Sequence, residues 1–146
     1  MLNLTTYLVV RVSLMDKLNP IEEINKVLDK NPYCWFGKYG EPLKSILHTD
    51  LSEKNYVLCL VYRNGAKYEM NSYKVLEISG NPKLTKSNHP VYYKSFISRI
   101  KSFVKITPLT AAQPALEDLY LKKSLNSILR ALQKSVRGHF VCASKK

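Results

Sequence analysis

The stretch YVLCLVYRNGAKYEMNSYKVLEIS, residues 56–79, limits the possible folds of this chain more than any other segment. Its first seven residues form a continuous apolar run, which is typical of a strand buried on both faces. The dipeptide Asn64-Gly65 follows, and it is a strong short-range signal for a β-hairpin. Residues 68–79 predict the return strand, so we expect the first half of the chain to be rich in sheet.

A strand and a short helix are predicted before this hairpin. Apolar and polar residues alternate over residues 6–16, TYLVVRVSLMD, which indicates a half-buried strand. The helix is expected to begin after Asn19, a capping residue, with Pro20 at its first position. It is expected to end near Asn31-Pro32.

Residues 33–42, YCWFGKYGEP, contain four aromatic rings, two glycines and the single Trp of the chain. This composition suits a strand that the glycines bend or break. In a strand, Trp35 and Phe36 point to opposite faces, so one side chain can enter the core and the other a pocket. Gly37 would allow close approach of a backbone or a ligand, or mark a bulge. Residues 41–55 are expected to form a helical turn and a loop.

The rest of the chain predicts a loop, an ambiguous aromatic segment, a long helix and a last strand. Turn-forming residues fill 79–90, and residues 91–107 suit either strand or helix. Apolar residues recur at helical spacing over 114–138, where Gly138 can end the helix. Residues 139–144 predict the closing strand.

Charge is distributed unevenly along the chain, whose formal net charge is +12. Residues 1–77 carry 10 Lys and Arg against 9 acids, whereas residues 78–146 carry 13 against two. A one-sided basic surface attracts phosphate backbones. Nucleic acid is therefore the favoured partner class, and the alternatives are simple solubility and binding to an acidic protein.

The chain length of 146 residues suits one domain over residues 1–146. Its apolar runs are too short to cross a bilayer and its N-terminus lacks signal-peptide features, so a cytoplasmic protein is expected. The three cysteines, Cys34, Cys59 and Cys142, are scattered and odd in number, which argues against a disulfide framework. We interpret them as small buried hydrophobic residues.

The order of predicted segments resembles the PUA-like superfamily and, within it, the EVE-type domains that read modified bases. The matching stretches are YCWFGKYGEPL, YVLCLVYRNGAKYEMNSYKVLEIS and HPVYYKSF. The resemblance implies an α+β fold, a small mixed β-barrel with flanking helices. It also implies an aromatic-lined pocket for a flipped base, in which Trp35 or a neighbouring aromatic residue stacks on the base while Asn71 and Ser72 read its edge.

Candidate pocket residues combine flat rings with polar groups, as recognition of a flipped base requires. Core packing is the alternative for Trp35 and for one of the two adjacent residues Tyr92 and Tyr93. The candidates are Tyr33, Trp35, Phe36, Lys38, Asn71, Ser72, Tyr92 and Tyr93.

Two groups of basic residues are candidates for phosphate contacts, which position a nucleic acid without reading its sequence. The alternative for the second group is a solvated helix face. The first, the loop cluster, contains Lys83, Lys86, Lys94, Arg99, Lys101 and Lys105. The second, the helical cluster, contains Lys122, Lys123, Arg130, Lys134 and Arg137.

The leading hypothesis is a non-catalytic module that binds DNA or RNA, with a modified base as its target. No phosphate-binding Gly-rich loop, nucleophile motif or metal-ligand spacing occurs in the sequence, so neither a cofactor nor a metal is expected. Two alternatives stay open. One is an RNA-modifying or hydrolytic enzyme on the same fold that uses His48, Lys38 and Glu41, and the other is a basic protein-interaction adaptor. A separately encoded nuclease or ATPase is a further candidate partner.

Overall fold

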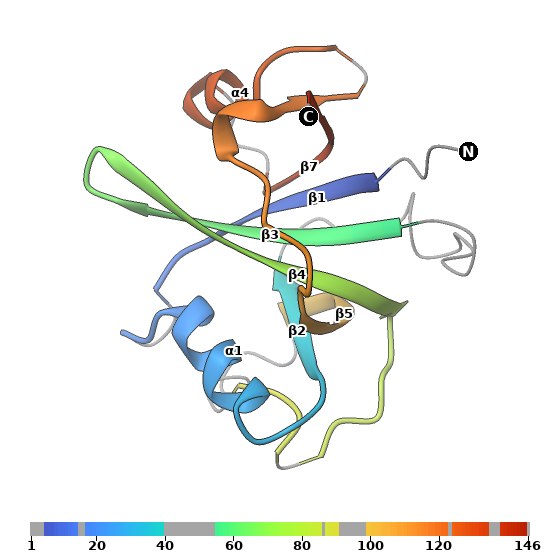
Figure 1. Ribbon diagram of the computed structural model, residues 1–146. Helices are drawn as coiled ribbons and strands as arrows, with labels where there is room; N and C mark the ends of the chain where they lie inside the picture. Colours follow the sequence, from blue (N-terminus) through green and yellow to red (C-terminus); the bar gives the residue numbers. More distant parts are fainter. Residues whose placement is uncertain are drawn as a thin grey trace.

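The computed structural model describes residues 5–14, 17–39, 55–85, 87–90, 99–122, 124–134 and 138–145. Within these residues a seven-stranded sheet carries two α-helices (Figure 1). The strands are β1 (Thr5–Val12), β2 (Cys34–Tyr39), β3 (Asn55–Asn64), β4 (Lys67–Ser79), β5 (Ile100–Pro108), β6 (Leu119–Leu121) and β7 (His139–Ser144). The helical elements are α1 (Pro20–Leu28), the 3₁₀ helix η2 (Leu116–Asp118) and α4 (Ile128–Lys134).

The strand order in the sheet is β2-β5-β4-β3-β1-β7-β6. β1 and β3 run parallel, and every other neighbouring pair of described strands is antiparallel. This arrangement confirms the expected α+β class. The described strands leave β2 and β6 as the two edges, so they do not close into the expected barrel.

The predicted hairpin is confirmed as β3 and β4. Asn64 pairs with Lys67, so the two-residue turn is Gly65-Ala66, one position later than the Asn-Gly dipeptide. Gly65 has a φ of +66°, the left-handed conformation that glycine adopts without steric cost. The alternating side chains of β3 are buried in two different clusters, which confirms a strand covered on both faces.

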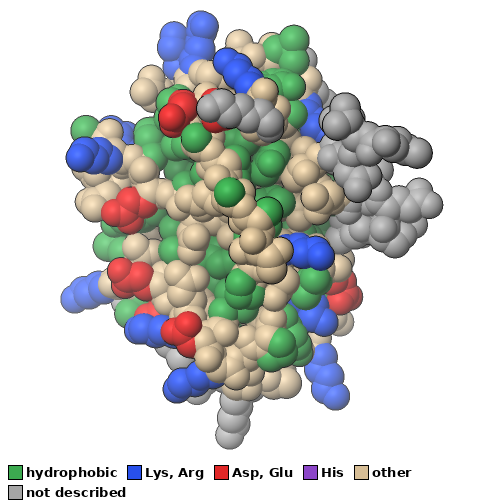
Figure 2. All heavy atoms as spheres, viewed as in Figure 1, with side chains coloured by type: hydrophobic (Ala, Val, Ile, Leu, Met, Phe, Trp, Pro, Cys, Tyr) green, Lys and Arg blue, Asp and Glu red, His purple; other side chains and the backbone are tan. Residues whose placement is uncertain are grey.

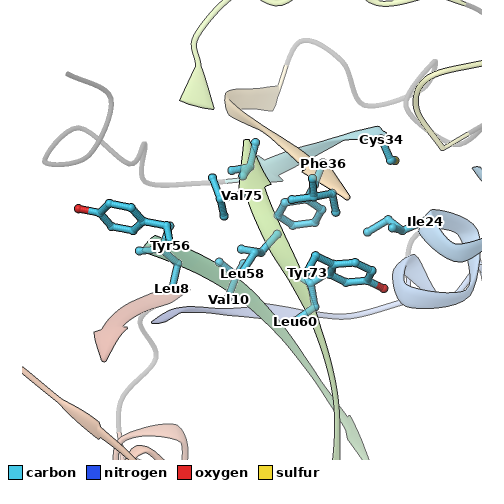
Figure 3. Close-up of a cluster of buried hydrophobic side chains, with 12 residues drawn as sticks. Leu8, Val10, Ile24, Cys34, Phe36, Tyr56, Leu58, Leu60, Tyr73 and Val75 are labelled. Carbon is cyan, nitrogen blue, oxygen red and sulfur yellow. The ribbon is translucent and has the colours of Figure 1, made fainter. Parts of the chain in front are cut away.

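Two clusters of buried side chains lie on the two faces of the central strands. The first cluster joins Leu8 and Leu58 to Ile24 of α1, and Phe36 of β2 packs against it (Figure 3). The second cluster lies under α4 and includes Val9 and Phe140. The expectation that the first strand is half-buried was therefore wrong, because α1 and α4 cover opposite faces of β1.

The predicted first helix is confirmed as α1, with its start set by its cap. The Asn19 Oδ1 accepts a hydrogen bond of 2.9 Å from the backbone N–H of Ile21, and Pro20 is the first helical residue. The helix ends at Leu28, and the side-chain amide of Asn31 donates to the Val27 carbonyl at 3.1 Å.

The long helix predicted over residues 114–138 is wrong for most of its length. Residues 119–121 form β6, which pairs with β7 at the edge of the sheet. A tight turn follows, in which the Leu121 N–H donates to the Asn126 carbonyl at 2.9 Å. Sheet pairing therefore replaces the helical hydrogen bonds that the apolar spacing predicted.

Helix α4 begins only after Ser127, whose Oγ accepts a hydrogen bond of 3.2 Å from the N–H of Arg130. Leu125, which the spacing assigned to the apolar face of a helix, is 70% exposed and has a φ of +62°. This left-handed backbone cannot continue an α-helix. The turn at Leu125 is the physical reason why the helix is short.

Two of the remaining sequence predictions can be compared with the structure, and others lie outside the described residues. The ambiguous segment is a strand, β5, over residues 100–108, and the last predicted strand is confirmed as β7. Residues 91–98 and 41–54 lie outside the described part of the chain. None of the described helices has the length and apolar character needed to span a membrane.

Candidate nucleic-acid interface

Trp35 lies in a small third cluster beside β2. Its side chain is 6% exposed and packs with Ile100 and Phe103. Tyr33 lies at the margin of the same cluster. Phe36 is buried in the first cluster instead, which confirms that Trp35 and Phe36 point to opposite faces of the strand.

A lysine covers the aromatic rings of this third cluster. The Nζ of Lys105 lies 4.3 Å from the centroid of the Tyr33 ring and 6.0 Å from that of Trp35. Both distances allow cation–π attraction. A base could therefore reach the Trp35 ring only if Lys105 and the packed neighbours of Trp35 moved.

Gly37 leaves space for the side chain of Ile100, whereas the sequence suggested close approach of a backbone or a ligand. A Cβ at this position would lie 2.7 Å from Cδ1 and 2.8 Å from Cγ2 of Ile100, closer than real Cβ contacts. The pairing of β2 with β5 shifts register between Lys38 and Tyr39, so the expected irregularity lies just after the glycine.

Lys38 is buried, with 3% exposure, although the sequence suggested a pocket residue. Its Nζ lies near the start of β7, because a Cβ on Gly138 would be only 3.7 Å from it. The other two residues of the enzyme alternative, His48 and Glu41, lie outside the described residues.

Asn71 and Ser72 take part in hydrogen bonds within the fold. The Asn71 side-chain amide donates to the Tyr73 hydroxyl at 2.9 Å, and that hydroxyl donates to Asn25 Oδ1 at 2.9 Å. Burial raises the pKa of Tyr73 above its usual range, so this hydroxyl stays protonated. Ser72 points to the other face of β4, where its hydroxyl donates to the Cys59 sulfur at 3.3 Å.

The predicted pocket residues are thus not brought together among the described residues. Tyr33 and Trp35 share the third cluster, whereas Phe36 and Asn71 lie on the side of the first cluster and Ser72 on the side of the second. Two further candidates lie outside the described residues, namely Tyr92 and Tyr93.

Among the described residues of the loop cluster, Lys105 lies over the rings of Tyr33 and Trp35. Lys83, Arg99 and Lys101 are exposed, and Lys105 is half-buried. Glu77 of β4 pairs with Lys105 of β5, which places an acidic residue beside this lysine in the sheet. Lys86 and Lys94 lie outside the described residues.

Sequence reasoning missed Asn88, which holds this loop against β2. Its side chain is 4% exposed, accepts from the Thr85 N–H at 2.9 Å and donates to the Lys83 carbonyl at 3.3 Å. Its carbonyl accepts from the Trp35 N–H at 2.8 Å. The turn-forming sequence SNHP was the available signal, but the long-range bond to β2 was not visible in it.

The helical cluster lies in a different part of the molecule. In Figure 1, α4 is at the top and β5 in the lower half. Arg130 and Lys134 of α4 are exposed, whereas the Nζ of Lys122 donates to the Thr6 hydroxyl at 2.6 Å. Lys123 and Arg137 lie outside the described residues. Figure 2 shows Lys and Arg side chains mainly around the rim of one face, with hydrophobic side chains in its middle.

The three cysteines are buried and free, which confirms their interpretation as small hydrophobic residues. Burial raises the pKa of Cys34 to about 12, that of Cys59 to about 11 and that of Cys142 to about 12. These thiols are therefore protonated and unreactive at neutral pH. Among the described residues, no three His, Cys, Asp or Glu side chains are grouped closely enough to hold a metal ion.

Comparisons of the chain with family models, with curated proteins and with solved structures found no match.

Proposed function

We propose that the protein is a non-catalytic module that binds nucleic acid through its phosphate backbone. The exposure of its cations carries the proposal: in the described part of the chain, thirteen Lys and Arg residues are exposed against five Asp and Glu. Lys26 is the exposed cation that forms an ion pair with a described acid, Glu23. Exposed Lys and Arg side chains displace counterions from a nucleic acid when they contact its phosphates, and this release of counterions favours binding.

The loop cluster is the proposed main contact. Lys105 lies where β5 is paired on both sides, with Trp35 of β2 and Glu77 of β4, so its backbone is held rigidly. Lys101 lies on the same strand, at the register shift between β5 and β2. Asn88 fixes the loop that carries Lys83. Rigid positioning reduces the conformational entropy lost on binding. Arg130 and Lys134 on α4 form a proposed second contact.

A charge reversal at Lys101 tests the proposal. We expect Lys101→Glu to weaken binding of short DNA and RNA duplexes and to reduce the slope of log K against log salt by about 1. Lys30→Glu is the matched control, because Lys30 is also exposed but follows α1 in the charge-balanced first half. Equal effects of the two substitutions would argue against the loop cluster, and absence of binding at low salt would refute the proposal.

Reading of a modified base on Tyr33 and Trp35, within a PUA-like and EVE-type fold, is a narrower form of the proposal. It requires Lys105 to leave the two rings that it covers. Titration of Trp35 fluorescence with unmodified and base-modified oligonucleotides at two salt concentrations tests it. Quenching that depends on the modification would support base reading. Salt-sensitive binding with unchanged Trp fluorescence would leave Trp35 as a core residue.

The proposal includes the cytoplasm as the compartment and a separately encoded nuclease or ATPase as a partner class. Three buried free thiols support a reducing environment.

A further inference from the structure

A cleft of about 290 Å³ lies where the β3–β4 hairpin meets α4, the helix that carries Arg130 and Lys134. None of its described lining residues belongs to either basic cluster. The parallel register of β1 and β3 pairs Arg11 with Val61, and the hairpin register pairs Arg63 with Tyr68, so these four side chains share one face of the sheet. The residues that line the cleft include Arg11, Ser13, Val61, Arg63, Tyr68 and Leu132.

Arg63 supplies the accessible cation of the cleft. It is exposed, and its Nε donates to the Gly65 carbonyl at 3.0 Å, which ties the guanidinium to the turn of its own hairpin. The two terminal amino groups are therefore the donors that can form a forked contact with an anionic group.

Arg11 supplies a fixed positive charge on another wall. Its Nη2 donates to the Leu132 carbonyl at 2.6 Å, in the last turn of α4, and its guanidinium lies 5.8 Å from the Phe140 ring centroid. A cation at this position offsets the partial negative charge of the helix C-terminus. The cleft wall thereby stays favourable to an anion although a helix ends there.

The chemistry of the lining is cationic and partly apolar, without a carboxylate among the lining residues. Glu69 is the nearest acid along the hairpin, but it lies on the other face of the strand, where its carboxylate accepts from Asn64 at 3.2 Å. Tyr68 is half-buried and offers a ring beside the aliphatic side chains of Val61 and Leu132. A flat ring that carries an anionic group matches this lining.

We propose that this cleft binds one nucleoside phosphate unit, with the base against Tyr68 and the phosphate on Arg63. Small-molecule pockets measure about 300–1,000 Å³, so a cleft at the lower limit takes a single nucleotide. The unit is either a free nucleotide or one nucleotide of a bound strand. In the second case the inference extends the proposed function by adding a site that contacts a base.

Isothermal titration of the full chain with adenosine monophosphate, inorganic phosphate and a short single-stranded oligonucleotide tests the inference. Arg63→Gln should weaken binding of the nucleotide unit about tenfold to a hundredfold, since it removes a charge-assisted contact. Tyr68→Leu should weaken it by a similar factor through lost stacking. The matched controls are Lys67→Gln, which removes an exposed charge from the same hairpin, and Tyr62→Leu, on the other face of β3.

Each outcome separates the two proposals. Mononucleotide binding that both cleft variants weaken and both controls preserve supports a free-nucleotide site, even if oligonucleotides do not bind. If the cleft variants weaken only the binding of the oligonucleotide, and weaken it more than the controls do, the cleft is a site for one nucleotide of a strand. Oligonucleotide binding that the cleft variants and controls affect equally overturns the cleft while the proposed function stands. Arg63 is exposed, so Arg63→Gln remains informative if Tyr68→Leu does not fold.

Discussion

Replacement of Gly37 by alanine would put a methyl group into space that the Ile100 side chain occupies. The new Cβ would lie 2.7 Å from Cδ1 and 2.8 Å from Cγ2 of Ile100, where ordinary van der Waals contact begins at 3.4 Å. Ile100 is 7% exposed and packs against Trp35 and Phe103, so it has little room to move away. The strain must therefore be absorbed by the cluster that holds Trp35.

Overpacking of a buried site by a methyl group costs about 1–3 kcal/mol of the unfolding free energy. For a chain of this size, such a loss lowers Tm by roughly 2–12 °C. Ile100→Ala removes Cδ1, Cγ2 and Cγ1, the three atoms that would crowd the new Cβ. Alone, this substitution should cost about 2–5 kcal/mol of the unfolding free energy. In a double-mutant cycle the two substitutions should couple favourably by about 1–3 kcal/mol, because the clash disappears when Ile100 is truncated.

Urea unfolding followed by Trp35 fluorescence measures these free energies, because Trp35 is the single Trp and lies in the affected cluster. Gly80→Ala is the matched control: a Cβ at Gly80 meets nothing within 4 Å, so this variant should be more stable by about 0.4–1 kcal/mol. A Gly37→Ala protein as stable as the Gly80→Ala protein, or a cycle without coupling, would refute the packing argument.

Three further predictions follow from single features of the fold. Leu125→Asn should raise the unfolding free energy by about 1 kcal/mol or less in urea titrations, because Asn tolerates the left-handed backbone that Leu125 adopts; a decrease would contradict this account. Asn19→Ala should lower the unfolding free energy by about 1 kcal/mol through loss of the α1 cap, whereas an unchanged value would show that the cap contributes nothing. The buried thiols should resist a thiol reagent at pH 8 until urea is added. Because burial raises the folded-state pKa of Cys59 from 9.0 to about 11, its contribution to stability should be complete below pH 9 and lost as the pH rises toward 11, and Cys59→Ala should lessen that slope.

Local signals predicted the elements whose determinants lie within a few residues of one another. The cap at Asn19 and the proline after it predicted the start of α1, and the apolar run before Asn64-Gly65 predicted β3 and its hairpin. The same kind of signal failed at Leu125, where apolar spacing alone indicated a helix. The pairing of β6 with β7 competes with helix formation there, and it joins segments about 20 residues apart, which apolar spacing within one segment does not reveal.

The candidate site was predictable only in part. The excess of cations in the second half was visible in composition, and exposure of Lys83, Arg99 and Lys101 is consistent with it. The burial of Trp35 was not predictable, because it depends on a side chain from β5 and on the loop that Asn88 holds in place. The cleft was not predictable either, since its two arginines come from different strands.

The sequence by itself determined the charge asymmetry, the α1 start and the central hairpin, because these follow from composition and from interactions between near neighbours in the chain. Only the tertiary structure decided that β1 lies parallel to β3, that Phe36 and Trp35 are both buried although they point to opposite faces, and that Arg11 and Arg63 line one cleft. Strand pairing couples residues that are far apart in the chain, and its register sets which side chains share a face.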